Sequence, residues 1–440
     1  MNTVNNSPKI VLLAIDGLSF PLLQKWVASG HLPTMKRLME GGSSGLLKPF
    51  IPSNSAVIWT SVMTGMSPQK HGIDSFIHYT LGKRVITKTA VKRMFNYGVR
   101  PFFRWLNKKG YIQDVPFSLG MVQQKMLWEL FSQENRNVGV INWWFSWPAS
   151  QVSGYIVSDR IHNWRLHERS SSTFLPATHL AYPHHLLDEL RDRVVNPFDL
   201  PDHVYERFMK LSREDIKQMK NYHYKRHQLM SEFKYLYAQD ESVRKLALCC
   251  LAGFAQPDFL ALYFRGIDII SHCALKYADW NRDSSITEEE VERYGETVHE
   301  YYRYVDSILG ELIESVSSDS TIMLVSDHGF EKEPDGRFGH RKTRPPGLFM
   351  LSGPQIREGL TVADATLYDI APTLLYLAGM PLSTEMDGTL LKECIEEPFL
   401  STHQVLTIPS YGIPVRKREP SLPDGDEEIK ERLRALGYID

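Results

Sequence analysis

Three runs of apolar and β-branched residues, each followed closely by an aspartate, constrain the fold of this 440-residue chain more than any other feature. Apolar runs of five or six residues with a polar break are typical of strands buried on both faces of a parallel sheet. The pattern therefore predicts an α/β fold. The runs and their acidic residues are Ile10–Ile15 with Asp16, Phe259–Phe264 with Asp268, and Thr321–Val325 with Asp327.

The polar residues that follow these runs predict a metal site. Parallel strands end at a common edge, where open α/β sheets bind ligands, so the three aspartates should meet there with His272 and His328. A single aspartate in such a place is more often a helix cap or a turn residue, but three repeats are hard to explain in that way. Carboxylate and imidazole ligands suit a divalent ion, Zn²⁺ first and then Mn²⁺ or Fe²⁺.

A serine at the start of a predicted helix is the candidate nucleophile. Ser53 and Ser55 precede Ala56, Trp59 and Val62, which recur at helical spacing. The free N–H groups of such a helix start favour an anion. An isolated serine here would only cap the helix, whereas a serine beside a bound metal ion would lose its proton readily and become a nucleophile. Both interpretations are open at this point.

Composition excludes several classes of protein. Hydrophobic residues make up 42% and charged residues 23%, as in ordinary soluble globular proteins. The net charge of −2 predicts no broad basic surface for nucleic acid or an anionic membrane. The polar N-terminus predicts no signal peptide, and no run is as long as a membrane-spanning helix. Four cysteines without framework spacing predict reduced thiols, so we expect a cytoplasmic protein.

The chain is predicted to form one domain, residues 1–440, with two insertions that act as caps or lids. Aromatic and basic residues mix in the first, at about 75–134, and charged helical patterns fill the second, at about 184–245. One long helix is predicted from Ile286 to Val316, ahead of the Thr321 strand.

Five motifs together resemble the alkaline phosphatase superfamily, and within it the type I phosphodiesterase and nucleotide pyrophosphatase group. This resemblance extends over nearly the whole chain. It implies a three-layer α/β/α alkaline phosphatase-like core, with a mostly parallel sheet, helical insertions and two divalent metal ions that clamp an in-line displacement. The motifs are IDG at 15–17, PSNSAVIWTSVMTGMSPQKHGI at 52–73, GIDIISH at 266–272, SDHGF at 326–330 and DIAPTLLYLAGMP at 369–381.

The resemblance also assigns ligands, one position at a time. It implies that one metal ion binds Asp16, Ser55, Asp327 and His328. It implies that the second binds Asp268, His272 and a histidine downstream of the SDHGF motif, a place that His340 occupies. His71 matches a histidine that is usually structural, and neither it nor His78 is assigned as a ligand.

The expected function is metal-dependent hydrolysis of a small phosphate ester, with Ser55 as the nucleophile and a phosphoseryl intermediate. Ser55–Trp59 lacks the proline and arginine of the sulfatase motif, so no sulfatase activity is expected. Ile58 replaces an asparagine common in nucleotide pyrophosphatases, which argues against nucleotide substrates, although Asn54 could take its place. Phosphotransfer or phosphomutase chemistry and a catalytically silent binding protein are the alternatives. The resemblance leaves monoester and diester substrates open and sets no oligomeric state.

Overall fold

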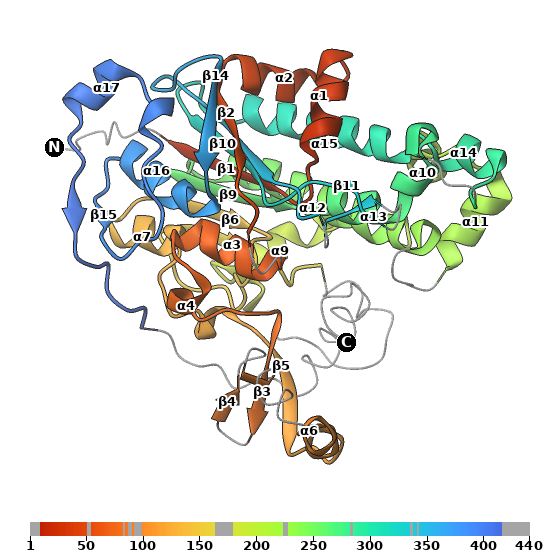
Figure 1. Ribbon diagram of the computed structural model, residues 1–440, viewed down its shortest axis with the longest axis horizontal. Coiled ribbons are helices and arrows are strands. Elements are labelled where there is room, and N and C mark those ends of the chain that lie inside the picture. Colours follow the sequence, from red (N-terminus) through yellow and green to blue (C-terminus); the bar gives the residue numbers. More distant parts are fainter. Residues whose placement is uncertain are drawn as a thin grey trace.

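A nine-stranded sheet organises the described part of the chain, in the order β14-β2-β13-β10-β1-β9-β6-β7-β8 (Figure 1). The computed structural model describes residues 9–50, 54–81, 84–86, 90–91, 99–162, 179–222, 228–281, 285–334, 338–340 and 343–415. The strands are β1 (Ile10–Ile15), β2 (Gly42–Leu47), β6 (Val138–Ile141), β7 (Gly154–Val157), β8 (Ala181–Tyr182), β9 (Phe259–Phe264), β10 (Thr321–Ser326), β13 (Gly347–Ser352) and β14 (Leu360–Ala365).

The three predicted strands lie side by side at the centre of the sheet. β1 pairs in parallel with β10 on one side and with β9 on the other. The parallel arrangement continues through β6 to β7. β13 and β8 run antiparallel to their neighbours. The predicted mostly parallel sheet is therefore confirmed, and β1, β9 and β10 end at the same edge.

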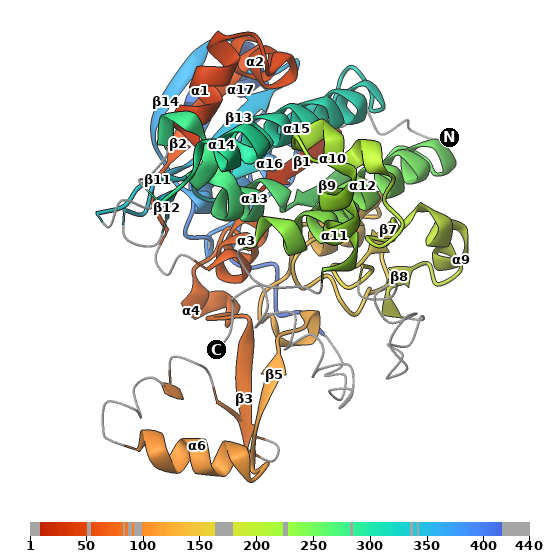
Figure 2. The ribbon, with the colours of Figure 1, turned by 90° about the vertical axis from the view of Figure 1, so that its right-hand side faces the viewer.

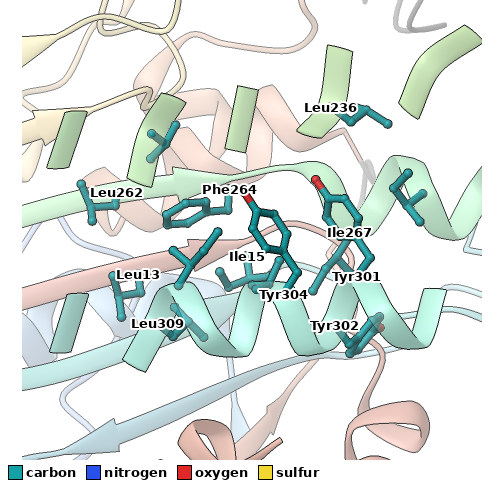
Figure 3. Close-up of a cluster of buried hydrophobic side chains, with 14 of the residues drawn as sticks. Leu13, Ile15, Leu236, Leu262, Phe264, Ile267, Tyr301, Tyr302, Tyr304 and Leu309 are labelled. Carbon is teal, nitrogen blue, oxygen red and sulfur yellow. The ribbon is translucent and has the colours of Figure 1, made fainter. Parts of the chain in front are cut away.

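Both faces of the sheet are buried, which explains the uninterrupted apolar runs. In β1, Val11, Leu13 and Ile15 belong to one hydrophobic cluster, whereas Ile10, Leu12 and Ala14 belong to another on the opposite face. Figure 3 shows the first cluster, where Leu13 and Phe264 face the helix that carries Tyr301 and Leu309. Helices cover both faces and form the outer layers of the α/β/α core (Figure 1). Helices that contribute apolar residues to the first cluster include α1 (Phe20–Ala28), α2 (Pro33–Glu40), α12 (Leu229–Gly253), α13 (Gly266–Ala274) and α15 (Thr297–Glu314). Helices that contribute to the second include α3 (Ser55–Thr64), α7 (Leu127–Gln133) and α16 (Ile370–Leu377).

The predicted single helix from Ile286 to Val316 is wrong. Two helices occupy this stretch, α14 (Glu288–Tyr294) and α15, and α14 ends where the N–H of Gly295 donates to the Val291 carbonyl. A Cβ atom at Gly295 would lie 2.6 Å from the Val291 oxygen and 3.2 Å from the Tyr277 oxygen. Glycine is favoured where backbone approaches this closely, and it is a weak helix former.

Most of the first predicted insertion projects from the body of the molecule (Figures 1 and 2). We call the described residues between 77 and 116 the finger. It contains a three-stranded sheet of β3 (Ile77–Leu81), β4 (Arg84–Ile86) and β5 (Ile112–Pro116) with helix α6 (Arg100–Lys108) beside it. Val91, Phe103 and Ile112 form a small core of its own.

The second predicted insertion contributes to the main core. It contains α9 (Leu186–Leu190), α10 (Asp202–Phe208), α11 (Arg213–Asn221) and the first part of α12. Leu186, Phe208 and Phe233 are buried in the first cluster. Whether either insertion acts as a lid stays a prediction. Within the described ranges, no helix combines the length and apolar character that crossing a bilayer requires.

Candidate active site and metal centre

The carboxyl ends of β1, β9 and β10 deliver the predicted acidic side chains to one buried place. Asp16 follows β1 directly, and Asp327 and His328 follow β10. After β9 the chain enters α13, which places Asp268 and His272 one helical turn apart. His272 Nε2 lies 3.5 Å from Asp268 Oδ1, so the turn brings both side chains together.

Two groups of side chains match the two predicted sets of ligands, apart from Ser55. In the first group, His328 Nε2 lies 3.4 Å from Asp16 Oδ1 and 3.5 Å from Asp327 Oδ2. In the second group, His340 Nε2 lies 3.9 Å from Asp268 Oδ1 and 3.1 Å from His272 Nε2. His340 follows the short strand β12 (Phe338–Gly339), which pairs with β11 (Glu331–Lys332) just after the SDHGF motif.

The two groups adjoin each other through His328. Its imidazole ring stacks on that of His340 with ring centroids 3.8 Å apart, and its Nε2 lies 3.9 Å from Asp268 Oδ1. Asp268, His328 and His340 therefore form a possible ligand set of their own beside Asp16, Asp327 and His328. Six of the seven predicted ligands come together in this way.

The electrostatics of the site fit a bound cation. Asp16 Oδ1, Asp268 Oδ1 and Asp327 Oδ2 are buried and accept no hydrogen bond from the described residues. Burial, and then the negative charge of Asp16, raise the pKa of the Asp268 and Asp327 carboxyls well above their usual range. A divalent ion would satisfy these oxygens and cancel the repulsion between the carboxylates, and the mixed N/O donors suit Zn²⁺, Mn²⁺ or Fe²⁺.

Two aromatic residues that the sequence analysis did not single out as site residues hold the first group in place. The Tyr263 hydroxyl donates to Asp16 Oδ2 at 2.5 Å, and the Trp59 indole N–H donates to the same oxygen at 3.4 Å. These bonds leave Asp16 Oδ1 directed at His328. The available signal was a tyrosine within an otherwise apolar strand, because a buried hydroxyl needs a hydrogen-bond partner.

Gly17 allows the first and second groups to lie so close together. Its φ is +72°, and a Cβ atom there would lie 2.7 Å from the Asp268 Cα atom. Its N–H also donates to Asp327 Oδ1 at 3.2 Å. Any larger residue would push α13 away from the end of β1, so the glycine of the IDG motif has a packing role.

Ser55 is the first residue of α3 and is buried. The N-cap position belongs to Asn54, whose side chain makes no capping hydrogen bond, so Ser55 is not the helix cap. Ser53, the other serine considered, lies outside the described residues. Ser55 and Trp59 are four residues apart and share a face of α3. Since Trp59 reaches Asp16, this face is directed at the first group.

The unassigned histidines have structural surroundings. His71 Nε2 lies 3.0 Å from Ser61 Oγ, and its Nδ1 accepts the N–H of Ile73. Burial lowers the pKa of His71 to about 3, so the ring is neutral. His78 lies in the finger, where its ring packs against Phe117.

Carboxylates and imidazoles thus gather at the carboxyl edge of a mostly parallel sheet, next to a helix N-terminus, so this is an α/β protein with a candidate metal centre. Residues 10–348 match the type I phosphodiesterase / nucleotide pyrophosphatase family, and the chain belongs to this family. The resemblance stated from the motifs is thereby confirmed.

Sulfatases and phosphoglycerate mutases, which also belong to the alkaline phosphatase superfamily, are among the relatives. Choline-sulfatase of Rhizobium meliloti (strain 1021) is 33% identical over 107 residues, 22% of this chain and 20% of that protein. Human (Homo sapiens) arylsulfatase K is 25% identical over 170 residues, 32% of this chain and 31% of that protein. A 2,3-bisphosphoglycerate-independent phosphoglycerate mutase of Agrobacterium fabrum (strain C58 / ATCC 33970) is 36% identical over 93 residues, 20% of this chain and 18% of that protein.

The chain thus spans between about a fifth and a third of the length of these curated relatives. A solved structure of BT4656 in complex with its substrate D-glucosamine-2-N,6-O-disulfate has a TM-score of 0.43 and 14% identity, covering 92% of this chain and 82% of that one. The family description names phosphodiesterases and nucleotide pyrophosphatases, and the curated relatives are named as sulfatases and phosphoglycerate mutases.

Proposed function

We propose that this chain is a metal-dependent phosphoric ester hydrolase with Ser55 as its nucleophile. One observation carries the proposal: two adjoining groups of buried carboxylates with buried or half-buried imidazoles lie at the sheet edge, and three carboxylate oxygens accept no hydrogen bond from the described part of the chain. Such a centre is costly to bury without a cation, because unpaired buried charges are strongly unfavourable.

The residues of the site would have separate roles in binding metal ions and in binding the phosphate. Asp16, Asp327 and His328 would hold one divalent ion together with Ser55, and Asp268, His272 and His340 would hold the other. Bound Zn²⁺, Mn²⁺ or Fe²⁺ would supply Lewis acidity, lowering the pKa of a coordinated hydroxyl and neutralising charge that develops on the phosphate. The free N–H groups at the start of α3 would bind phosphate oxygens.

In the proposed reaction the Ser55 hydroxyl loses its proton and its oxygen attacks phosphorus. The bond to the alcohol breaks, the alcohol leaves with a proton, and a phosphoserine is formed. Water then attacks phosphorus, releases the phosphate product and returns a proton to the serine oxygen. Asp16, Asp327 and Ser55 are all buried, and burial would restrict their side chains to few positions.

Replacement of Ser55 by alanine tests the nucleophile. The variant should fold and keep metal on Asp16, Asp327 and His328, because carboxylate and imidazole bind a divalent ion more strongly than a hydroxyl does. It should lose at least about a thousandfold in turnover, because covalent catalysis is removed while charge stabilisation remains. Ser67→Ala is the matched control. Ser67 lies at the start of another helix, α4 (Pro68–His71), and its side chain makes no capping hydrogen bond. A fully active Ser55→Ala enzyme would overturn the role of Ser55, and phosphate on the Ser55 peptide after quenching would support it.

A panel of substrates and acceptors tests the reaction class. Purified protein should bind divalent metal and hydrolyse phosphate monoesters or diesters, whereas a silent binding protein would do neither. Because mutases are among the relatives, each assay should include an acceptor alcohol, and transfer in place of phosphate release would favour phosphotransfer. Cleavage of sulfate esters in preference to phosphate esters would contradict the proposal.

A further inference from the structure

Three large aromatic side chains lie exposed on the finger. Phe102 and Trp105 on α6, and Tyr111 just beyond its end, are 60%, 49% and 59% exposed. The rings of Phe102 and Trp105 stack with centroids 5.9 Å apart and an angle of 14° between their planes, and Tyr111 lies next to Trp105. We call these three residues the aromatic patch. Clustered exposed apolar side chains usually mark an interaction surface.

The aromatic patch is not needed for the core of the finger. Phe103, on another side of α6, is buried against Val91 and Ile112, and Leu106 packs on the same small core. The ring of Phe103 also meets that of Tyr79 edge-on. An amphipathic helix buries one face and normally offers polar residues to water on the other, so aromatic residues on the outer side of α6 are unusual and point to an interaction surface.

The charge of this segment identifies the kind of partner. Residues 77–116, the span of the finger, contain nine of the 50 Lys and Arg residues and only one, Asp114, of the 52 Asp and Glu residues. The rest of the chain therefore has 41 basic and 51 acidic residues, a formal charge of −10. The net charge of −2 of the whole chain is the sum of these two opposite charges. A positively charged segment with exposed aromatic rings is complementary to a surface that is negatively charged and partly apolar.

We propose that the aromatic patch docks on the surface of an anionic lipid bilayer. Tryptophan and tyrosine rings prefer the boundary between lipid headgroups and acyl chains, and basic residues near such rings are attracted to anionic headgroups. The finger projects well beyond the body of the molecule (Figure 2), so α6 can meet a flat surface without obstruction by the core. Attachment of this kind is peripheral and needs no membrane-spanning helix.

Single-stranded nucleic acid is the competing partner, because it also binds basic and aromatic surfaces. Bases stack on open aromatic faces along a groove. In the aromatic patch, the rings of Phe102 and Trp105 stack on each other, so one face of each ring is less open to a base. They form one continuous apolar surface, which suits lipid better than separate bases.

Vesicle flotation of the full chain tests the proposal. Phosphatidylcholine vesicles are compared with vesicles of equal parts phosphatidylcholine and phosphatidylglycerol, for the wild type and for Phe102→Ser/Trp105→Ser. The wild type should float with the anionic vesicles only, and rising salt should weaken binding because it screens the headgroup charge. The double variant should bind at least about tenfold more weakly, since each aromatic ring contributes through buried apolar area.

Trp280→Ser is the matched control, because Trp280 is also an exposed tryptophan, at 45%, but lies outside the finger. It should bind vesicles like the wild type, and all variants should melt like the wild type and hydrolyse a soluble ester at the same rate. Absence of wild-type binding to anionic vesicles, or equal binding by the double variant, would overturn the proposal. Binding of single-stranded RNA that the double variant loses, without binding to vesicles, would assign the aromatic patch to nucleic acid instead.

Discussion

The sheet edge and the helices around α12 and α15 both contain buried aspartates, and the partners of these aspartates differ. At the sheet edge, Asp16, Asp268 and Asp327 each keep one oxygen that no described residue satisfies with a hydrogen bond. Among the helices that contribute to the first cluster, α12 carries Asp240, which accepts the N–H groups of Arg265 at 3.2 Å and Gly266 at 3.0 Å. It also accepts the Tyr301 hydroxyl at 3.0 Å.

Asp306 in α15 resembles Asp240, because both of its carboxylate oxygens accept hydrogen bonds from backbone N–H groups. Its carboxylate accepts the N–H groups of Thr34 at 3.1 Å and Met35 at 2.8 Å, at the start of α2. Burial raises the pKa of Asp240 and Asp306, as it does at the sheet edge, but here backbone N–H groups counteract it. At the edge, Asp16 instead raises the pKa of its acidic neighbours further. Burial alone therefore does not separate a structural aspartate from a ligand, whereas the partners of its oxygens do.

The largest effect is expected from removing a ligand. Asp327→Asn or His328→Ala should abolish activity and lower metal occupancy, because a site that loses one ligand holds its ion poorly. In metal-free protein, Asp327→Asn should be at least as stable to urea as the wild type, since it relieves repulsion with Asp16. Asp306→Asn is the control and should retain metal and turnover. Normal occupancy and turnover in both ligand variants would remove the first group from the proposal.

Loss of the bond that orients Asp16 should have the next largest effect. Tyr263→Phe removes the hydroxyl that donates to Asp16 Oδ2 and should weaken metal affinity about 10–100-fold. Competition with a chelating dye measures the change. Tyr304→Phe is matched, because it removes a buried hydroxyl that donates to Glu241 on the other face. Equal changes in both variants would show that the effect is general destabilisation.

Asp240 should give the protein a pH-dependent stability that does not involve the metal site. Burial raises its pKa from 3.8 to about 6, so the folded state binds the proton more tightly than the unfolded state. Its contribution to stability is present below pH 3.8 and is lost as the pH rises through about 6. Relative to Asp240→Asn, the free energy of unfolding of the wild type should fall by on the order of 2 kcal/mol between these limits. Parallel pH profiles in urea unfolding would contradict this.

The smallest effect is expected in metal affinity, and it should distinguish Asp240 from Asp306. Asp240→Ala and Asp306→Ala should each cost about 1–2 kcal/mol of unfolding free energy, because two N–H groups lose their acceptor. Only Asp240→Ala should also weaken metal binding, by roughly tenfold or less, since α13 carries Asp268 and His272. Equal metal affinity in the two variants would mean that the start of α13 needs no support from α12.

The sequence by itself determined the central strands and the residues that end them. Apolar runs with a polar break are local signals, so the limits of β1 and β9 agree with the prediction to the residue. Two of the predicted ligands, Asp16 and Asp327, follow their strands directly. His340 came from the motif resemblance, because a histidine in a polar loop has no periodic signal of its own.

Only the tertiary structure decided which of these residues are neighbours. The order β10-β1-β9 brings three chain segments, more than 50 residues apart from one another in sequence, to the same place. No local pattern specifies that order, so the position of His328 between the two groups and the support of Asp16 by Tyr263 could not be predicted. The same holds for the split at Gly295, where the Tyr277 carbonyl approaches from another segment. Periodicity reports the burial of a residue, whereas its partners depend on how the elements pack together.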